Sequence, residues 1–246
     1  MSGFLACVEV GGSGIETTVF SPDGSFVIND GAHQPRGAEL AIAVPGLIEG
    51  DRVVVASNLG WVDVDPVDKL GLTGPAAVLC NDAEAAALGE ATLRDIGARE
   101  LAFVGLGTGV GGAVVTGTTV VAGNLFGHGP LVGHARCRCG RRGCLETVAA
   151  GWALPTELNH AQLLAVADAV ARAIRAEPVA ASAALVVVGG GVARDNPVLV
   201  DLIRQAIGDR VVERSAAPTA SKSAAAWGLR RLAERRTPAV KTGGLG

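Results

Sequence analysis

Residues 101–116, LAFVGLGTGVGGAVVT, place the glycine-rich segment GTGVGG between two apolar runs of strand-forming residues. This segment matches the pattern G-x-G-x-x-G, which in dinucleotide-binding folds lies between a strand and a helix. Here the residues that follow, AVVTG, predict a second strand instead. We therefore expect a β-hairpin whose backbone amides and Thr108 hydroxyl bind phosphate.

A similar arrangement occurs near the start of the chain, where residues 4–29 contain three β-rich runs separated by GGSG and SPDG. Both separators have turn chemistry, so we predict an antiparallel meander. Taken alone, GGSG fits a simple hairpin turn better than a phosphate site. A third cluster, GGG at 189–191, ends an apolar strand before a predicted helix. Together the three clusters predict nucleotide binding, and the repeated layout predicts a duplicated core.

The remaining periodicity outlines the other elements. Strands are expected at 40–44, 52–56 and 76–79, and helices just after Asp82, at 161–176, within 195–207 and within 223–236. No long linker interrupts the sequence, which indicates that any two lobes are closely joined.

Composition limits the classes of protein to consider. The chain has 246 residues, 49% hydrophobic and 18% charged, with a net charge of −3. This charge gives no overall attraction to nucleic acid or to an anionic membrane. No apolar run approaches the roughly 20 residues of a membrane span, and the first residues lack a signal-peptide pattern. We expect a cytoplasmic protein with neither nucleic-acid nor membrane partners.

The segment VLCNDAEAAALGE, residues 78–90, places Asn81 and Asp82 where a predicted strand gives way to a helix. Asp82 could simply cap that helix, which would stabilise it by about 1 kcal/mol. Alternatively, it is a general base that orients a sugar hydroxyl toward a γ-phosphate, while Asn81 binds a neighbouring hydroxyl. Glu9, just before the first glycine loop, would then hold Mg²⁺ through water. The alternative for Glu9 is an exposed strand carboxylate.

Cysteines are concentrated in HGPLVGHARCRCGRRGC, residues 128–144, which contains three of the five in the chain. An odd cysteine count argues against a disulfide framework and favours thiolates gathered around a metal. The arginines of this stretch also permit a zinc-stabilised nucleic-acid binder. Four basic residues on a mildly acidic protein are more typical of a solvated face.

Seven segments occur in an order that resembles the ROK family (repressor, open reading frame, kinase): VEVGGSG, VPGLI, SNLGW, NDAEAAALGE, VGLGTGVGG, CRCGRRGCLE and VVVGGGV. The resemblance covers residues 4–232. It implies an α/β fold of the two-lobed actin-like, hexokinase type (ribonuclease H-like) with a structural zinc site, closing on ATP and a sugar, in a homodimer. We place the first lobe at 1–97 with a closing helix at 221–236, the second lobe with its zinc loop at 98–220, and a flexible tail at 237–246.

The same resemblance assigns functional positions. Asp82 matches the catalytic base, and the sugar-contacting positions are Asn58, Asn81, His128 and Glu146. The phosphate-loop positions are Gly11, Gly12, Ser13, Thr108 and Gly109, and those on the adenosine side are Gly189, Gly190 and Gly191. The zinc ligands are His128, Cys137, Cys139 and Cys144, which form a closed site without a position for catalytic water. His134 remains the alternative histidine, although its closeness to Cys137 would force a tight loop.

Several positions depart from the family pattern. Leu125 replaces a sugar-binding glutamate, Glu9 replaces aspartate, and Ser13 replaces threonine. The sequence lacks the long helix expected between RGAEL and AVPGLI, and the segment after AAGWAL is short. No helix-turn-helix precedes the first loop, so we expect no direct DNA binding.

These observations predict a shortened, glucokinase-like enzyme that uses ATP and Mg²⁺ to phosphorylate a hydroxyl of a hexose, an amino sugar or a sugar-like polyol. The alternative is a non-catalytic sugar- or nucleotide-binding sensor, which Leu125 and the two deletions favour. The sequence leaves open the sugar, the hydroxyl, and the choice between ATP and polyphosphate as donor.

Overall fold

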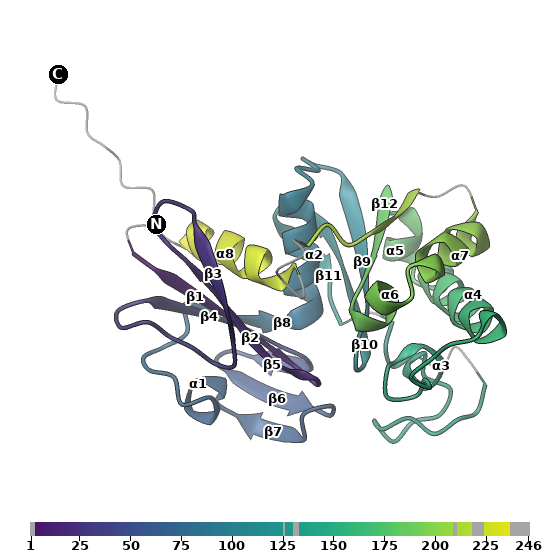
Figure 1. The fold of residues 1–246 in the computed structure, drawn as a ribbon, viewed down its shortest axis with the longest axis horizontal. Coiled ribbons are helices and arrows are strands. Elements are labelled where there is room, and N and C mark those ends of the chain that lie inside the picture. Colours follow the sequence, from purple (N-terminus) through teal and green to yellow (C-terminus); the bar gives the residue numbers. More distant parts are fainter. Residues whose placement is uncertain (1–2, 125, 130–132, 209–210, 218–223, 237–246) are drawn as a thin grey trace.

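The computed structural model describes residues 3–124, 126–129, 133–208, 211–217 and 224–236. Leu125, the start of the predicted closing helix at 221–223 and the predicted tail at 237–246 lie outside the described residues. The described chain forms two five-stranded sheets and one three-stranded sheet (Figure 1).

The first five-stranded sheet has the order β3-β2-β1-β4-β8. Its strands are β1 Leu5–Gly11, β2 Gly14–Phe20, β3 Phe26–Asp30, β4 Glu39–Val44 and β8 Val78–Asn81. The first three are antiparallel, which confirms the predicted meander, and β4 and β8 continue the sheet in parallel. Strand β8 begins and ends two residues later than predicted, because its register with β4 extends to the pair Val44 and Asn81.

The second five-stranded sheet repeats this topology with the order β11-β10-β9-β12-β13. Its strands are β9 Glu100–Leu106, β10 Val110–Thr116, β11 Thr119–Ala122, β12 Leu185–Gly189 and β13 Val211–Arg214. Again three antiparallel strands are followed by two parallel ones. The predicted duplication is therefore present in strand order. The predicted lobe boundary between residues 97 and 98 lies in the connection from α2 to β9.

A small third sheet projects from the first one. It has the order β5-β6-β7, with β5 Leu47–Glu49, β6 Arg52–Ala56 and β7 Trp61–Val64, and helix α1 Pro66–Lys69 follows it. The described connection from β3 to β4, residues 31–38, contains no helix. The residues between RGAEL and AVPGLI, where the sequence predicts a missing helix, lie within strand β4.

Two helices lie between the large sheets, α2 Asp82–Leu93 and α8 Ala225–Arg236 (Figure 1). Their surfaces are rich in alanine and glycine, which lets the two backbones approach closely. A side chain at Gly89 would overlap the carbonyl of Ala224, and one at Gly228 would overlap that of Ala85. The apolar residues of both helices share one core with β1, β4, β9 and β10.

The remaining helices cover the other face of the second sheet, where α4 and α7 pack against each other (Figure 1). They are α3 Glu146–Ala149, α4 His160–Ala176, α5 Pro178–Ser182, α6 Gly191–Asp195 and α7 Val198–Ile207. The helix predicted within 195–207 is α7, which begins at Val198. Residue 195 belongs to the separate short helix α6 that precedes it. Apolar residues recur at helical spacing in α4 and α7, so each buries one face.

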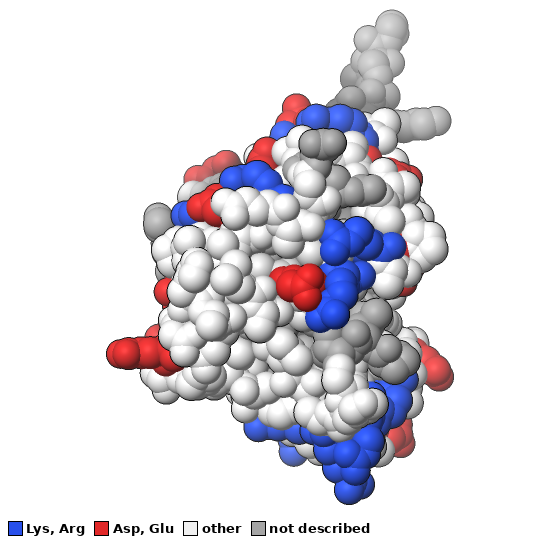
Figure 2. Space-filling view, turned by 90° about the vertical axis from the view of Figure 1, so that its right-hand side faces the viewer, with Lys and Arg blue, Asp and Glu red and all other residues white. Residues whose placement is uncertain are grey.

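Charged residues on this end of the molecule are dispersed. Figure 2 shows Lys and Arg in separate groups, with uncharged surface between them. Arginines of α4 and α7 form ion pairs within their own helices, such as Arg172 with Asp168 and Arg204 with Asp201. Within the described residues, no helix is long and apolar enough to cross a bilayer.

Candidate active site

The N-terminus of α2 carries the predicted base. Asn81, the last residue of β8, caps the helix: its Oδ1 accepts hydrogen bonds from the Ala83 amide at 2.9 Å and the Glu84 amide at 3.3 Å. Its Nδ2 donates to the Gly46 carbonyl at 3.0 Å. The alternative in which Asp82 is the cap is therefore wrong. Asp82 is instead the first residue of the helix.

Asp82 has an unusual environment for a carboxylate. Burial raises its pKa to about 6, the hydrogen bond from the Ala83 amide opposes this shift, and the charge of Glu84 adds to it. A carboxylate with a pKa closer to neutrality accepts a proton more readily while staying mostly ionised at pH 7.

Glu146, at the start of α3, is the most enclosed predicted sugar ligand, with 2% exposure. Its Oε1 accepts a hydrogen bond from the Val110 amide at 2.9 Å and lies 3.5 Å from Asn58 Nδ2. His128 Nε2 is 4.0 Å from the same oxygen. Asn58 and His128, which come from two other segments, therefore both approach the carboxylate of Glu146.

Asn58 has an unpaired polar atom in this group. Its Oδ1 is buried and has no hydrogen-bond partner among the described residues. Leaving such an acceptor unpaired costs about 1–3 kcal/mol, so it marks a place for a donor such as a hydroxyl group.

The start of β10 touches both the first turn of α2, which begins with Asp82, and the group around Glu146. A side chain at Gly111 would lie 3.2 Å from Ala83 Cβ, so the first turn of α2 lies against the start of β10. Glu146 binds the amide of the preceding residue, Val110. Gly109, which precedes Val110, leaves room for the side chains of Asn58 and Glu146. A Cβ at this position would overlap both of them.

The two predicted phosphate loops are the tips of the β1–β2 and β9–β10 hairpins. They face each other, since a Cβ at Gly12 would lie 2.7 Å from Thr108 Cγ2. Gly11, Gly12 and Ser13 thus oppose Thr108 and Gly109, with backbone exposed on both sides. Small residues at such a junction let amides approach an anion.

The third glycine cluster ends β12 and begins α6. Gly190 has φ +88°, and a side chain there would overlap the Leu106 carbonyl. Gly189 lies beside Ser215, whose amide donates to the Val188 carbonyl at 3.0 Å. The glycines at 189 and 190 therefore let the end of β12 pack closely against β9 and Ser215, and the role of the cluster toward adenosine stays a prediction.

Glu9 is placed differently from the other predicted residues. Its Oε1 accepts a hydrogen bond from the Ala226 amide at 2.9 Å, at the N-terminus of α8. The carboxylate thus stabilises a helix end. Its role toward Mg²⁺ stays a prediction.

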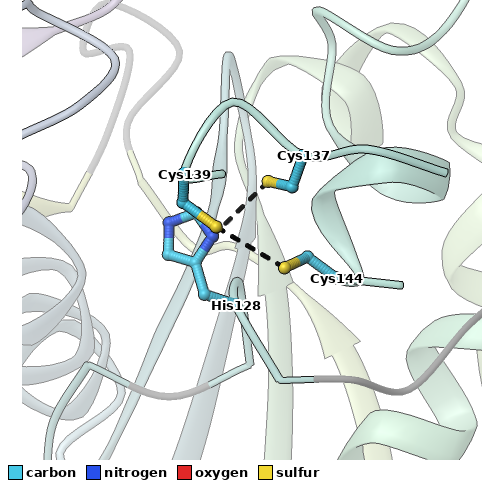
Figure 3. A group of neighbouring side chains, drawn as sticks. All are labelled: His128, Cys137, Cys139 and Cys144. Carbon is cyan, nitrogen blue, oxygen red and sulfur yellow. Dashed lines mark hydrogen bonds between the residues drawn. The ribbon is translucent and has the colours of Figure 1, made fainter. Parts of the chain in front are cut away.

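The four predicted zinc ligands come together (Figure 3). The ligand atoms of His128, Cys137, Cys139 and Cys144 all lie within 4.8 Å of one another. Cys139 Sγ is 3.7 Å from Cys144 Sγ, and Cys137 Sγ is 3.7 Å from His128 Nδ1. Zinc–sulfur bonds of about 2.3 Å in a tetrahedron separate the sulfurs by about 3.8 Å. The cluster thus fits a closed zinc site, and His134 is not part of it.

The orientation of His128 joins this cluster to the sugar-contacting group. Its Nδ1 faces the cysteines, and its Nε2 faces Glu146. One imidazole can therefore bind a metal through one nitrogen and donate a hydrogen bond through the other.

Sequence reasoning did not identify two contacts of Glu146. The Val110 amide is a backbone group and has no sequence signal beyond the glycine loop. Trp152 donates from Nε1 to Glu146 Oε2 at 3.2 Å. A single tryptophan in an irregular segment shows no periodicity that could have revealed this role.

Comparison with known proteins decides the family. The ROK family model matches residues 24–183. The chain belongs to the ROK family. Among curated ROK relatives, it is 32% identical to the kanosamine kinase of Amycolatopsis mediterranei, over 92% of this chain and 88% of the relative. It is 30% identical to an N-acetylmannosamine kinase of Escherichia coli, over 60% of this chain and 61% of the relative.

Solved ROK structures show the same fold. The ROK hexokinase from Thermus thermophilus superposes with a TM-score of 0.67 at 24% identity, over 94% of this chain and 99% of that one. A ROK family glucokinase from Streptomyces griseus in complex with glucose and AMPPNP gives a TM-score of 0.65 at 20% identity, over 95% and 99%. The two-lobed hexokinase-type fold predicted from the sequence is thereby confirmed.

Proposed function

We propose that this sugar kinase of the ROK family transfers the γ-phosphoryl group of ATP to a hydroxyl of a hexose, an amino sugar or a sugar-like polyol, with Asp82 as the general base. The observation that carries the proposal is the placement of Asp82. It begins α2, whose first turn packs against the start of β10, where Ala83 lies beside Gly111 and the neighbouring Val110 amide binds Glu146.

In the proposed reaction, Asp82 accepts the proton of the sugar hydroxyl as that oxygen attacks the γ-phosphorus. The bond from phosphorus to the bridging oxygen of ATP breaks, and ADP leaves. The transition state of such a transfer is loose, so positioning and charge neutralisation contribute more than the strength of the base. Mg²⁺ bound with ATP would neutralise phosphate charge, with Glu9 as its predicted partner through water.

The sugar side of the site would be formed by Asn58, Asn81, His128 and Glu146. Asn58 Oδ1 is a buried acceptor without a donor, and Glu146 can accept further hydrogen bonds beside those it receives. One hydrogen of the Asn81 amide is used by Gly46, which leaves the second for a ligand. Several acceptors next to few donors suit a ligand rich in hydroxyl groups.

Zinc would act structurally in this proposal. His128, Cys137, Cys139 and Cys144 satisfy four coordination positions, so no position remains for a substrate or a catalytic water. The ion would fix the loop that begins with His128 and leads directly into Glu146.

The decisive experiment is a kinase assay with purified protein, Mg-ATP and a panel of hexoses, amino sugars, N-acetylated amino sugars and polyols. Polyphosphate replaces ATP in a parallel series. We expect phosphorylation of at least one sugar, and calorimetry with the same panel measures binding separately. Sugar binding without turnover by any donor would contradict the proposal and favour the non-catalytic sensor.

We also propose that the protein acts as a cytoplasmic homodimer without a nucleic-acid partner. The separate basic groups on the face drawn in Figure 2 support only the part of this proposal that concerns nucleic acid. Light scattering on the eluted protein gives the molar mass, and a monomer would contradict the dimer. Salt-dependent binding to DNA or RNA would contradict the proposal that the protein has no nucleic-acid partner.

A further inference from the structure

Trp152 lies where three parts of the site meet. Its Nε1 donates to Glu146 Oε2 at 3.2 Å. Its backbone amide donates to the Thr108 carbonyl at 3.4 Å, and the preceding Gly151 amide donates to the Gly107 carbonyl at 2.8 Å. The indole is thus held at the phosphate loop through its backbone while its side chain reaches the predicted sugar ligand.

The zinc loop covers the other part of the same side chain. The guanidinium of Arg138, between Cys137 and Cys139, lies 4.7 Å from the centre of the Trp152 ring. Such a cation–π contact is worth about 0.5–1 kcal/mol at an exposed site. Arg138 therefore restrains the indole from the side of the zinc ligands. Its guanidinium contacts the Trp152 ring, whereas the sequence favoured a solvated face for the arginines of this loop.

The two oxygens of Glu146 are fixed by different donors. The Val110 amide holds Oε1 at 2.9 Å, and the Trp152 indole holds Oε2. Two donors from separate segments define both the position and the plane of the carboxylate. Longer contacts add to them, from Asn58 Nδ2 to Oε1 at 3.5 Å and from Cys137 Sγ to Oε2 at 3.8 Å. The indole is the shorter of the two contacts on Oε2, so its loss would leave this oxygen the less restrained one.

We propose that Trp152 is a positioning residue, which orients Glu146 for a sugar hydroxyl and is itself held by Arg138, so that the zinc loop and the sugar-binding group are coupled. This inference rests on the proposed role of Glu146 as a sugar ligand. The interaction is made equally in the ground state and the transition state, so its loss raises KM for the sugar and leaves kcat nearly unchanged.

The test is Trp152→Phe, which keeps an aromatic ring and removes the indole N–H. Because a hydrogen bond to a charged group is involved, we expect KM for the sugar to rise about tenfold. KM for ATP and the zinc content should stay as in the wild type. Trp227→Phe is the matched control: that indole packs between Phe20 and Phe26 and has no hydrogen-bond partner in the described chain.

A second pair of variants tests the coupling. Arg138→Met keeps the aliphatic stem and removes the cation, and we expect KM for the sugar to rise about threefold. Arg138→Lys restores a cation and should recover most of this change. The emission of Trp152, isolated in a Trp61→Phe/Trp227→Phe protein, should shift when zinc is chelated.

The outcomes separate this inference from the proposed function. If the wild type phosphorylates a sugar and Trp152→Phe keeps the wild-type KM, the positioning role is overturned. An equal rise of KM for sugar and ATP would also overturn it, because that indicates a general structural defect. If the wild type phosphorylates nothing, the proposed function fails, while sugar affinities measured by calorimetry still decide whether Trp152 positions Glu146.

Discussion

The first and second five-stranded sheets share one strand order, but the segments inserted into them differ. In the first sheet, the connection from the third to the fourth strand is the short stretch 31–38. In the second sheet, the equivalent connection, from β11 to β12, carries the zinc ligands, Glu146, Trp152 and helices α3 to α5. The comparison teaches that the strand order sets the two phosphate hairpins, whereas the unequal insertions build the sugar side.

The two halves also make different chemical contributions under the proposed function. The first half supplies the base, at the junction of β8 and α2, together with Asn58 and Asn81, and the second half supplies His128, Glu146 and the cysteine cluster. Replacing the base in the first half should therefore lower turnover, and replacing zinc ligands in the second half should lower stability.

The largest effect is expected for Asp82→Asn. The substitution keeps the size of the side chain and removes the proton acceptor, so we expect kcat to fall by about 10²–10⁴-fold. Sugar affinity, measured by calorimetry, should change little. Turnover at the wild-type rate would show that another group is the base and would break the proposed division between the halves.

The pH dependence tests the same residue independently. Because burial raises the pKa of Asp82 to about 6, the base is ionised above this pH and protonated below it. We expect kcat/KM to fall about tenfold for each unit of pH below 6. A profile that stays flat down to pH 5 would contradict the assignment.

The zinc loop should govern stability more than turnover. Cys144→Ser replaces a fully buried thiol by a poorer ligand, and we expect loss of zinc. An ion that binds only the folded state at about 100 times its Kd stabilises that state by about 2.7 kcal/mol. Metal analysis and denaturant unfolding measure the change, and full zinc content in the variant would refute the ligand assignment.

A smaller effect is expected where the two halves touch. Gly12→Ala places a methyl group against Thr108 Cγ2, and overpacking of this kind costs about 1–3 kcal/mol. We expect KM for ATP to rise about tenfold while sugar affinity is retained. The double variant Gly12→Ala/Thr108→Ser removes the nearest opposing atom, Cγ2, but keeps Cβ at 2.9 Å, and should recover ATP binding in part. Gly3→Ala, with no atom within 4 Å, is the control.

The smallest effect concerns the helix that carries the base. Asn81→Ala removes the cap of α2 and should lower the free energy of unfolding by about 1 kcal/mol. Asn81→Ser retains a capping oxygen and should recover most of that loss. Equal destabilisation by both variants would indicate that the bond to Gly46, and not the cap, is the important one.

Local patterns predicted much of this molecule. The glycine-rich turns between apolar runs gave both meanders, because turn chemistry and alternation act within a few residues. The start of α2 was also predicted closely, although Asn81 and not Asp82 caps it. Both residues are good caps by composition, and the register of β8 against β4, which no local pattern encodes, selects Asn81.

Contacts between distant segments were harder to predict. The three cysteines cluster in sequence, so a metal site could be inferred, and the family resemblance supplied His128. Trp152 lies six residues from Glu146, yet their contact depends on how the chain turns after α3. The contact of Asn58 Nδ2 with Glu146 Oε1 joins residues 88 positions apart and has no sequence signal.

The bond between Glu9 and Ala226 joins residues 217 positions apart, and α8 shares one core with β1 and β4. A ribosome produces the first sheet early, but the helix that covers its apolar face is made only after the second sheet. Contacts of such long sequence separation form slowly and leave hydrophobic surface exposed in the meantime. During synthesis, the half that carries the base must therefore wait for α8 before its core can close.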